Sequence, residues 1–160
     1  MSSNDRPEIL IALGANLPSP AGAPSETLKA ALIHLEQAGV AVLKLSSFRE
    51  TVAWPDPSEP PFINAAASLQ TALDPFALLE LLHATETAYG RVRSRLNAPR
   101  PLDLDLLAHG DTVLTGEQLT LPHPLIARRR FVLEPLAEIA PAWRHPVTGL
   151  TPGQMLAALD

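Results

Sequence analysis

The chain has 160 residues and a net charge of −5, and 46% of its residues are hydrophobic, so we expect one folded domain spanning residues 1–160 and exclude an intrinsically disordered protein. The acidic balance argues against a general nucleic-acid-binding protein, and the absence of cysteine excludes disulfides and thiolate metal sites. No apolar run approaches the roughly 18 residues of a membrane span and no secretory signal is visible, so the sequence predicts a cytoplasmic protein that does not bind a membrane.

The first half of the chain predicts three strands, one helix and a long loop. Apolar or alternating runs place the strands at residues 9–13, 40–48 and 62–69. The helix is expected between Ser25, its candidate N-cap, and Gly39. Residues 51–61 include four prolines and therefore predict a loop, and long loops in compact domains often carry function.

The second half predicts a strand between helices that have recognisable starts. Asp74 followed by Pro75 is typical of an N-cap with proline at the first helical position, and this helix should end near Tyr89. The remaining predictions are a strand over the D-L-D segment, a turn near Gly110, short strands at 112–114 and 118–121, a helix over 124–138 broken at Pro135, and a last helix opened by a capping box of Thr151 and Gln154.

The predicted order of elements is β-α-β-β-α-β, followed by further strands and helices. This order indicates an α+β protein with a ferredoxin-like split βαβ core, in which helices pack on the faces of an antiparallel sheet. The fold class alone assigns no activity.

The segment from Arg91 to Asp105 is the most informative part of the chain, because four arginines precede two aspartates one residue apart. On a strand, Asp103 and Asp105 would share a face roughly 7 Å apart, and such a pair repels unless cations lie over it. Mg²⁺ with nucleotide phosphates would satisfy both the acids and the arginines. A solvated strand face with surface ion pairs is the alternative at this point.

The distribution of cations favours the phosphate hypothesis. Seven of the 12 Lys and Arg residues fall in two short stretches, 91–100 and 128–130. The familiar alternatives for binding phosphate or activating a nucleophile are absent, since the chain has no P-loop, no Rossmann glycine fingerprint, no zinc-type histidine spacing and no nucleophile elbow. Any phosphate chemistry would therefore depend on arginines and metal.

Six stretches of the chain resemble the 6-hydroxymethyl-7,8-dihydropterin pyrophosphokinase family. They are A-L-G-A-N-L (12–17), S-S-F-R-E-T (46–51), F-I-N-A-A-A (62–67), G-R-V-R (90–93), P-R-P-L-D-L-D (99–105) and L-T-L-P-H-P (119–124). They occur in the family's order over nearly the whole chain. The resemblance implies transfer of pyrophosphate from ATP to the pterin hydroxymethyl group in folate biosynthesis, which leaves AMP.

The resemblance also implies roles for individual residues around the phosphates. Asp103 and Asp105 match the ligands of two Mg²⁺ ions, and Arg91 and Arg100 match catalytic-loop arginines that stabilise developing charge. Residues that match nucleotide-contacting positions are Glu86, Arg93, Thr120, His123 and Arg129. Two of these have plain alternatives, since Glu86 could be an exposed helix charge and His123 a structural turn residue.

For the pterin, the resemblance implies an amide that reads the ring edge and aromatic side chains on the ring faces. Asn64 supplies donor and acceptor, and Phe62 and Phe131 supply the faces, unless either phenylalanine belongs to the core. Thr51, Ala53 and Trp54 match the pterin loop. The catalytic loop departs from the family, because it is about one residue shorter and lacks a frequent tryptophan.

Two other functions stay open at this point. One is a catalytically inactive ferredoxin-like module that binds pterin or nucleotide, and the other is a metal-dependent transferase that acts on a different alcohol. Under the main hypothesis, the partners are ATP and the pterin alone, without nucleic acid, and the chain is expected to be a monomer.

Overall fold

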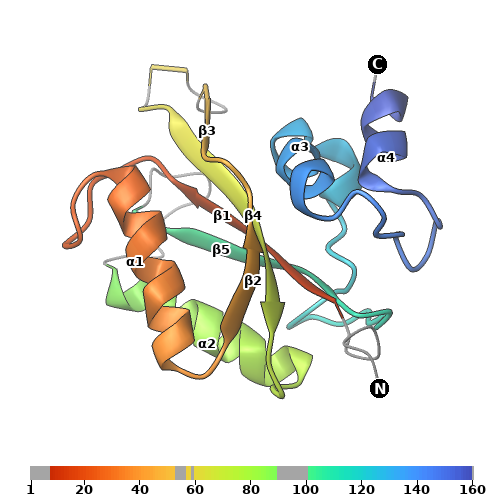
Figure 1. Ribbon diagram of the computed structural model, residues 1–160, viewed down its shortest axis with the longest axis horizontal. Helices are drawn as coiled ribbons and strands as arrows, with labels where there is room; N and C mark the ends of the chain where they lie inside the picture. Colours follow the sequence, from red (N-terminus) through yellow and green to blue (C-terminus); the bar gives the residue numbers. More distant parts are fainter. Residues whose placement is uncertain (1–7, 53–56, 59, 90–100, 160) are drawn as a thin grey trace.

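The computed structural model describes residues 8–52, 57–58, 60–89 and 101–159 and consists of one antiparallel sheet with helices on both faces (Figure 1). The strands are β1 (Ile9–Ala15), β2 (Ala41–Leu45), β3 (Arg49–Thr51), β4 (Phe62–Gln70) and β5 (Asp103–His109). The helices are α1 (Pro24–Gln37), α2 (Pro75–Ala88), the 3₁₀ helix η2 (Ile126–Arg128), α3 (Arg130–Ile139) and α4 (Pro152–Ala158).

The strands follow the order β2-β4-β1-β5, with β3 pairing the end of β4 beyond β2. All pairs are antiparallel, which confirms the predicted α+β class and its antiparallel sheet. Helices α1 and α2 cover one face, and α3 with α4 lies over part of the other (Figure 1).

Alternation along the strands produces two separate hydrophobic cores. In β1, Ile9, Ile11 and Leu13 point into the core beneath α1 and α2. Leu10 points the other way, into a smaller core that α3 and α4 complete. The remainder of that second face, beyond the reach of α3 and α4, carries polar side chains.

Two helix starts are as the sequence predicts. The Asp74 side chain accepts a hydrogen bond from the backbone N–H of Ala77, and Thr151 with Gln154 forms the expected capping box. The start of α1 differs, because the N-cap is Ala23 and makes no side-chain hydrogen bond. Pro24 takes the first helical position, which its fixed φ suits, so Ser25 lies inside the helix.

Three other predictions need correction. The strand expected over residues 40–48 ends at Leu45 as β2, and a further strand that was not predicted, β3, follows at Arg49–Thr51, because Ser46 and Ser47 between them bond other elements. The short strands expected at 112–114 and 118–121 reduce to one bridge, between Leu114 and Leu121. The helix expected over 124–138 breaks at Arg129, whose backbone is extended, and Pro135 lies inside α3.

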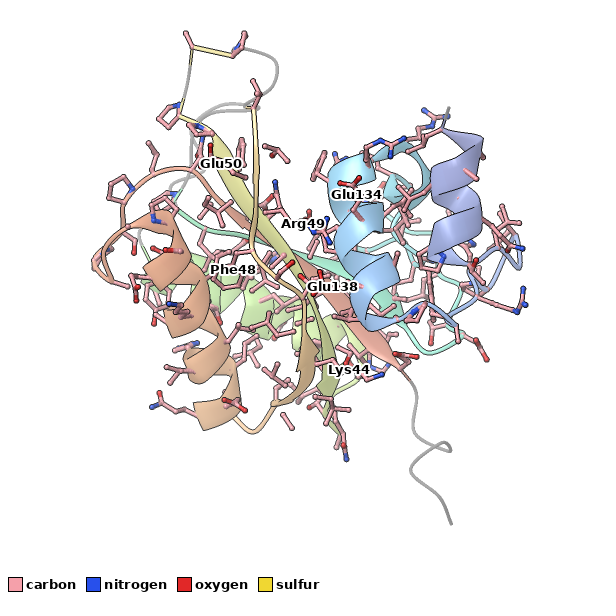
Figure 2. The ribbon with its side chains drawn as sticks, turned by 45° about the horizontal axis from the view of Figure 1, so that its top comes forward. Lys44, Phe48, Arg49, Glu50, Glu134 and Glu138 are labelled. Carbon is pink, nitrogen blue, oxygen red and sulfur yellow. The ribbon has the colours of Figure 1, made fainter. Side chains whose placement is uncertain are left out.

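A cluster of three residues, the Glu138 clamp, ties the β2–β3 connection and β3 to α3. The carboxylate of Glu138 accepts hydrogen bonds from the Ser47 backbone N–H (2.8 Å), the Ser47 hydroxyl (2.8 Å) and Arg49 Nη2 (3.0 Å). Figure 2 shows Arg49 reaching from β3 toward Glu138 on α3. The clamp therefore joins segments 89 to 91 residues apart in the chain.

The clamp should make stability depend on pH through Glu138. Hydrogen bonds from the Ser47 backbone, then from the side chains of Arg49 and Ser47, lower the pKa of Glu138 below its ordinary value of 4.5. A carboxylate with a lowered pKa contributes stability that is present above its unfolded-state pKa and lost as the pH falls through the folded-state pKa. The urea-midpoint difference between wild type and Glu138→Gln should therefore be steady near neutral pH and shrink below about 4.5. A difference unchanged in acid would contradict this account.

Candidate active site

Four strands place a row of polar and small residues across the partly uncovered face of the sheet. Asp103 on β5 pairs with Gly14 on β1, Gly14 with Asn64 on β4, and Asn64 with Arg49 on β3. Directly paired residues in an antiparallel sheet share a face, and neighbouring strands lie about 4.8 Å apart. Asp103 and Asn64 are therefore separated by roughly 10 Å, with only a glycine between them.

The acidic pair lies on this face as the D-L-D alternation predicts. Asp103 and Asp105 are half-buried, whereas Leu102, Leu104 and Leu106 are buried in the opposite core. Asp105 pairs with Ala12, so small residues lie beside both acids on β1.

The donor set fits Mg²⁺ bound together with a nucleotide. Two carboxylates supply hard oxygen ligands, and the described residues contain no group of three or more acidic or histidine side chains that could hold a metal unaided. Mg²⁺ is usually bound by one or two carboxylates, with substrate phosphates and waters completing its octahedron. The pair therefore suits a cation that arrives with ATP better than a permanently bound one.

Glu86 of α2 is buried behind the acidic pair. It is 2% exposed, and its Oε2 accepts a hydrogen bond of 2.7 Å from the backbone N–H of Leu104, the residue between the two aspartates. The alternative of an exposed helix charge is therefore wrong. A role for Glu86 near the nucleotide stays a prediction, and the observed contact is to the strand that carries the acids.

His123 lies close to this acidic end of the row. Its backbone N–H bonds to Leu107 O, and its Nδ1 accepts a hydrogen bond from the Leu125 N–H at 3.1 Å. Burial lowers the pKa of His123 below its ordinary 6.5, positive Arg129 lowers it further, and Asp103 opposes both. The ring is therefore neutral at pH 7 and, with Nδ1 accepting, carries its proton on Nε2.

The α3 N-terminus places a cation and an aromatic ring near the same site. The guanidinium carbon of Arg129 lies 5.6 Å from the ring centroid of Phe131, a cation–π contact. Phe131 is 41% exposed, which rules out the alternative that this ring belongs to the core. Phe62 is half-buried at the start of β4.

Asn64 is held in one orientation by its neighbours. It is 7% exposed, and its Nδ2 donates to Thr51 Oγ1 at 2.7 Å. The side chain keeps a second N–H and its Oδ1 for a ligand. The predicted pterin residues Asn64, Thr51 and Phe62 thus lie together, since Thr51 also pairs with Phe62.

Gly14 belongs to the A-L-G-A-N-L stretch, but the sequence alone does not reveal its role in the site. A Cβ at this position would lie 3.1 Å from Asn64 Oδ1 and 3.9 Å from Phe62 Cδ1. Asn16, at the end of the same motif, donates from Nδ2 to Pro60 O at 3.1 Å and so holds the end of the long loop. Both contacts join residues more than 40 positions apart, which only the register of β1 and β4 could predict.

We expect Gly14→Ala to disturb the pterin side of the site. The added methyl group must push the Asn64 amide by a few tenths of an ångström. This shift would weaken the hydrogen bond that the amide is predicted to make with the pterin. The KM for the pterin should rise about tenfold, equivalent to roughly 1.4 kcal/mol. Steady-state kinetics with each substrate varied would measure it, with Gly153→Ala as control because a Cβ there meets nothing within 4 Å. An unchanged pterin KM would contradict the proposed contact.

Thr120 is half-buried, and its hydroxyl donates to Gly116 O at 3.3 Å. Its predicted contact to the nucleotide stays a prediction. Five predicted site residues lie outside the described residues: Ala53, Trp54, Arg91, Arg93 and Arg100.

The sequence profile of the 7,8-dihydro-6-hydroxymethylpterin-pyrophosphokinase family matches residues 10–141. The chain belongs to this family. A 2-amino-4-hydroxy-6-hydroxymethyldihydropteridine pyrophosphokinase from Synechocystis sp. is 40% identical over 152 residues, which cover 94% of this chain and 75% of that protein. A protein of the same name from Methylorubrum extorquens is 39% identical and is matched over 92% of its length.

Solved structures agree with the fold of this pyrophosphokinase family member. The crystal structure of Plasmodium falciparum HPPK-DHPS with pteroate superposes with a TM-score of 0.72, covering 96% of this chain at 12% identity. The chain spans 44% of that longer protein, so the likeness shows the fold alone. None of the helices in the described part of the chain has the length and apolar character needed to cross a membrane.

Proposed function

We propose that the chain transfers a pyrophosphoryl group from ATP to the hydroxymethyl group of 6-hydroxymethyl-7,8-dihydropterin, forming AMP and the pterin diphosphate for folate biosynthesis. Family membership over residues 10–141 and relatives that are named for this activity support the assignment. They favour an active enzyme over the catalytically inactive module.

One geometric observation supports this proposal. The acidic pair on β5 and the amide of Asn64 on β4 share a sheet face, with Gly14 between them. Asp103 and Asn64 are about 10 Å apart, which is two strand spacings. Phosphates bound over Asp103 and a pterin bound against Asn64 would therefore lie next to each other above Gly14. This separation suits a pyrophosphoryl group passing from one side to the other.

Asp103 and Asp105 are the proposed ligands of two Mg²⁺ ions that accompany ATP. When bound, these ions would neutralise phosphate charge and polarise the reacting phosphoryl group. The two side chains hold them in place because both carboxylates project from a strand whose backbone Glu86 fixes. The number of ions is part of the proposal.

The remaining residues orient the substrates. The Nε2–H of neutral His123 and the guanidinium of Arg129 are donors for phosphate oxygens. Asn64 binds the edge of the pterin ring, and Phe62 and Phe131 stack on the faces of that ring. Arg91 and Arg100 are proposed to stabilise charge in the transition state, Arg93 to contact the nucleotide, and Ala53 and Trp54 to contact the pterin.

A cytoplasmic location and a monomeric state are also proposals. The absence of cysteine is compatible with a reducing compartment. The monomer could be tested by light scattering at several protein concentrations.

Phosphorus NMR tests the function directly. With MgATP and the hydroxymethyl-dihydropterin, the spectrum should show AMP and a pterin diphosphate appearing together. ADP as the sole nucleotide product would reject pyrophosphoryl transfer, and turnover that is faster with a different alcohol would favour the alternative metal-dependent transferase. Binding of both substrates without any product would favour the inactive module.

A further inference from the structure

We propose that the Glu138 clamp is a positioning device for the pterin half of the site. The inference rests on the proposed function, because it requires that Thr51 and Asn64 bind the pterin. It concerns Ser47, Arg49 and Glu138, none of which matches a substrate-contacting position.

Strand β3 needs such support because it is short. It comprises three residues and, within the described part of the chain, pairs only with β4, over Arg49–Asn64, Glu50–Ile63 and Thr51–Phe62. A strand of this length with one neighbour is marginal by itself. Yet Thr51 of β3 supplies the oxygen that receives the Asn64 N–H, so movement of β3 would release the amide.

The two serines before β3 fasten it in two directions. Ser46 is buried and bonds to both backbone groups of Ala66 on β4, through its N–H (2.9 Å) and its Oγ (2.9 Å). Ser47 points the opposite way and gives both its donors to Glu138 on α3. Arg49, the β3 residue paired with Asn64, adds the third bond to the same carboxylate.

Helix α3 is the fixed end of this clamp. Its residues Val132, Leu133, Leu136 and Ile139 are buried in the second core, so α3 does not depend on Glu138 for its position. The same helix has Arg129 as its N-cap and Phe131 in its first turn, about 14 Å and about 10 Å along the axis from Glu138. The clamp thus sets the distance between β3 and a helix that is already anchored, and loss of the clamp should move β3 alone.

This asymmetry predicts a selective kinetic effect. Glu138→Ala and Ser47→Ala should each raise the KM for the pterin about fivefold to tenfold, while the KM for ATP and kcat stay within about twofold. Ser47→Thr keeps the hydroxyl and should restore the wild-type pterin KM. Glu134→Gln is the control, because Glu134 lies one turn earlier on α3 and pairs with Arg130 of the same helix (3.6 Å), whereas Glu138 bonds Arg49 of β3 (Figure 2).

The measurement is steady-state kinetics at a temperature where circular dichroism shows every variant folded. A merely structural clamp would lower the melting temperature and leave the pterin KM unchanged, and that result would overturn the proposal. If Glu138→Ala does not fold, Glu138→Gln and Ser47→Ala give the same test. Asn64→Ala distinguishes failure of the pterin-site assignment from failure of the clamp proposal. A normal pterin KM in Asn64→Ala would reject the pterin site itself. A raised pterin KM in Asn64→Ala, with a normal pterin KM in the clamp variants, would reject only the clamp.

Discussion

Replacing Asp105 with asparagine is expected to lower kcat by about a thousandfold, close to 4 kcal/mol of transition-state stabilisation. The substitution keeps the size of the side chain and its place on β5, but removes one of the two negative charges that are proposed to bind Mg²⁺ with the phosphates of ATP. The one remaining carboxylate, Asp103 opposite Gly14, would hold a divalent cation weakly, since no cluster of three ligating side chains exists among the described residues.

Two measurements would test this expectation. Turnover gives kcat, and titration of Mg²⁺ into protein with a non-hydrolysable ATP analogue reports cation binding without chemistry. Asp111→Asn is the control, because Asp111 is an exposed acid just beyond the end of β5. Near-normal turnover in Asp105→Asn would mean that the carboxylate pair is structural.

Glu86→Leu is expected to damage both stability and turnover. The substitution leaves the buried N–H of Leu104 without its acceptor, a loss of about 1–3 kcal/mol. The melting temperature should fall by roughly 4–8 °C for a 2 kcal/mol loss in a protein of this size. Because Leu104 lies between the two aspartates, a shift of its backbone should also reduce kcat and weaken Mg²⁺-dependent nucleotide binding.

Glu86→Gln distinguishes the causes of that effect. Glutamine keeps a carbonyl oxygen that can accept from Leu104, so its melting temperature should stay much nearer to wild type than that of Glu86→Leu. Glu80→Gln, at an exposed position of the same helix, should change neither stability nor activity. Equal melting temperatures for Glu86→Leu and wild type would show that the buried bond contributes nothing.

Sequence reasoning succeeded where the cause of a structure is local. The D-L-D alternation predicted which side of β5 carries the acids, because a strand repeats every two residues. Asp74 and Thr151 cap helices through bonds to backbone groups three residues away, so their patterns are readable in the chain. The element order was sufficient for the α+β class with its antiparallel sheet.

It failed where the cause lies far along the chain. The break between β2 and β3 depends on Ser46 bonding Ala66 and Ser47 bonding Glu138, 20 and 91 residues away. The burial of Glu86 depends on Leu104, and the need for glycine at position 14 depends on Asn64. None of these pairings follows from helix or strand periodicity, because each one requires the sheet register or helix packing to be known first.

Part of the candidate site could likewise be predicted from the sequence. Its residue types followed from the motifs, and the structure brings Asp103 near His123 and Arg129 at one end of the row and Thr51, Phe62 and Asn64 together at the other. The row that connects the two ends through Gly14 came only from the strand order.

The central strand contributes Ala12 and Gly14, and hardly any side-chain atoms, to the surface between the acids and the amide. A side chain at position 14 would press on Asn64 and lie against Phe62, so mutation has little freedom to diversify this position. Members of the family that come to prefer altered pterins, or that escape an inhibitor, should therefore change in the segments around the rim and keep this base intact.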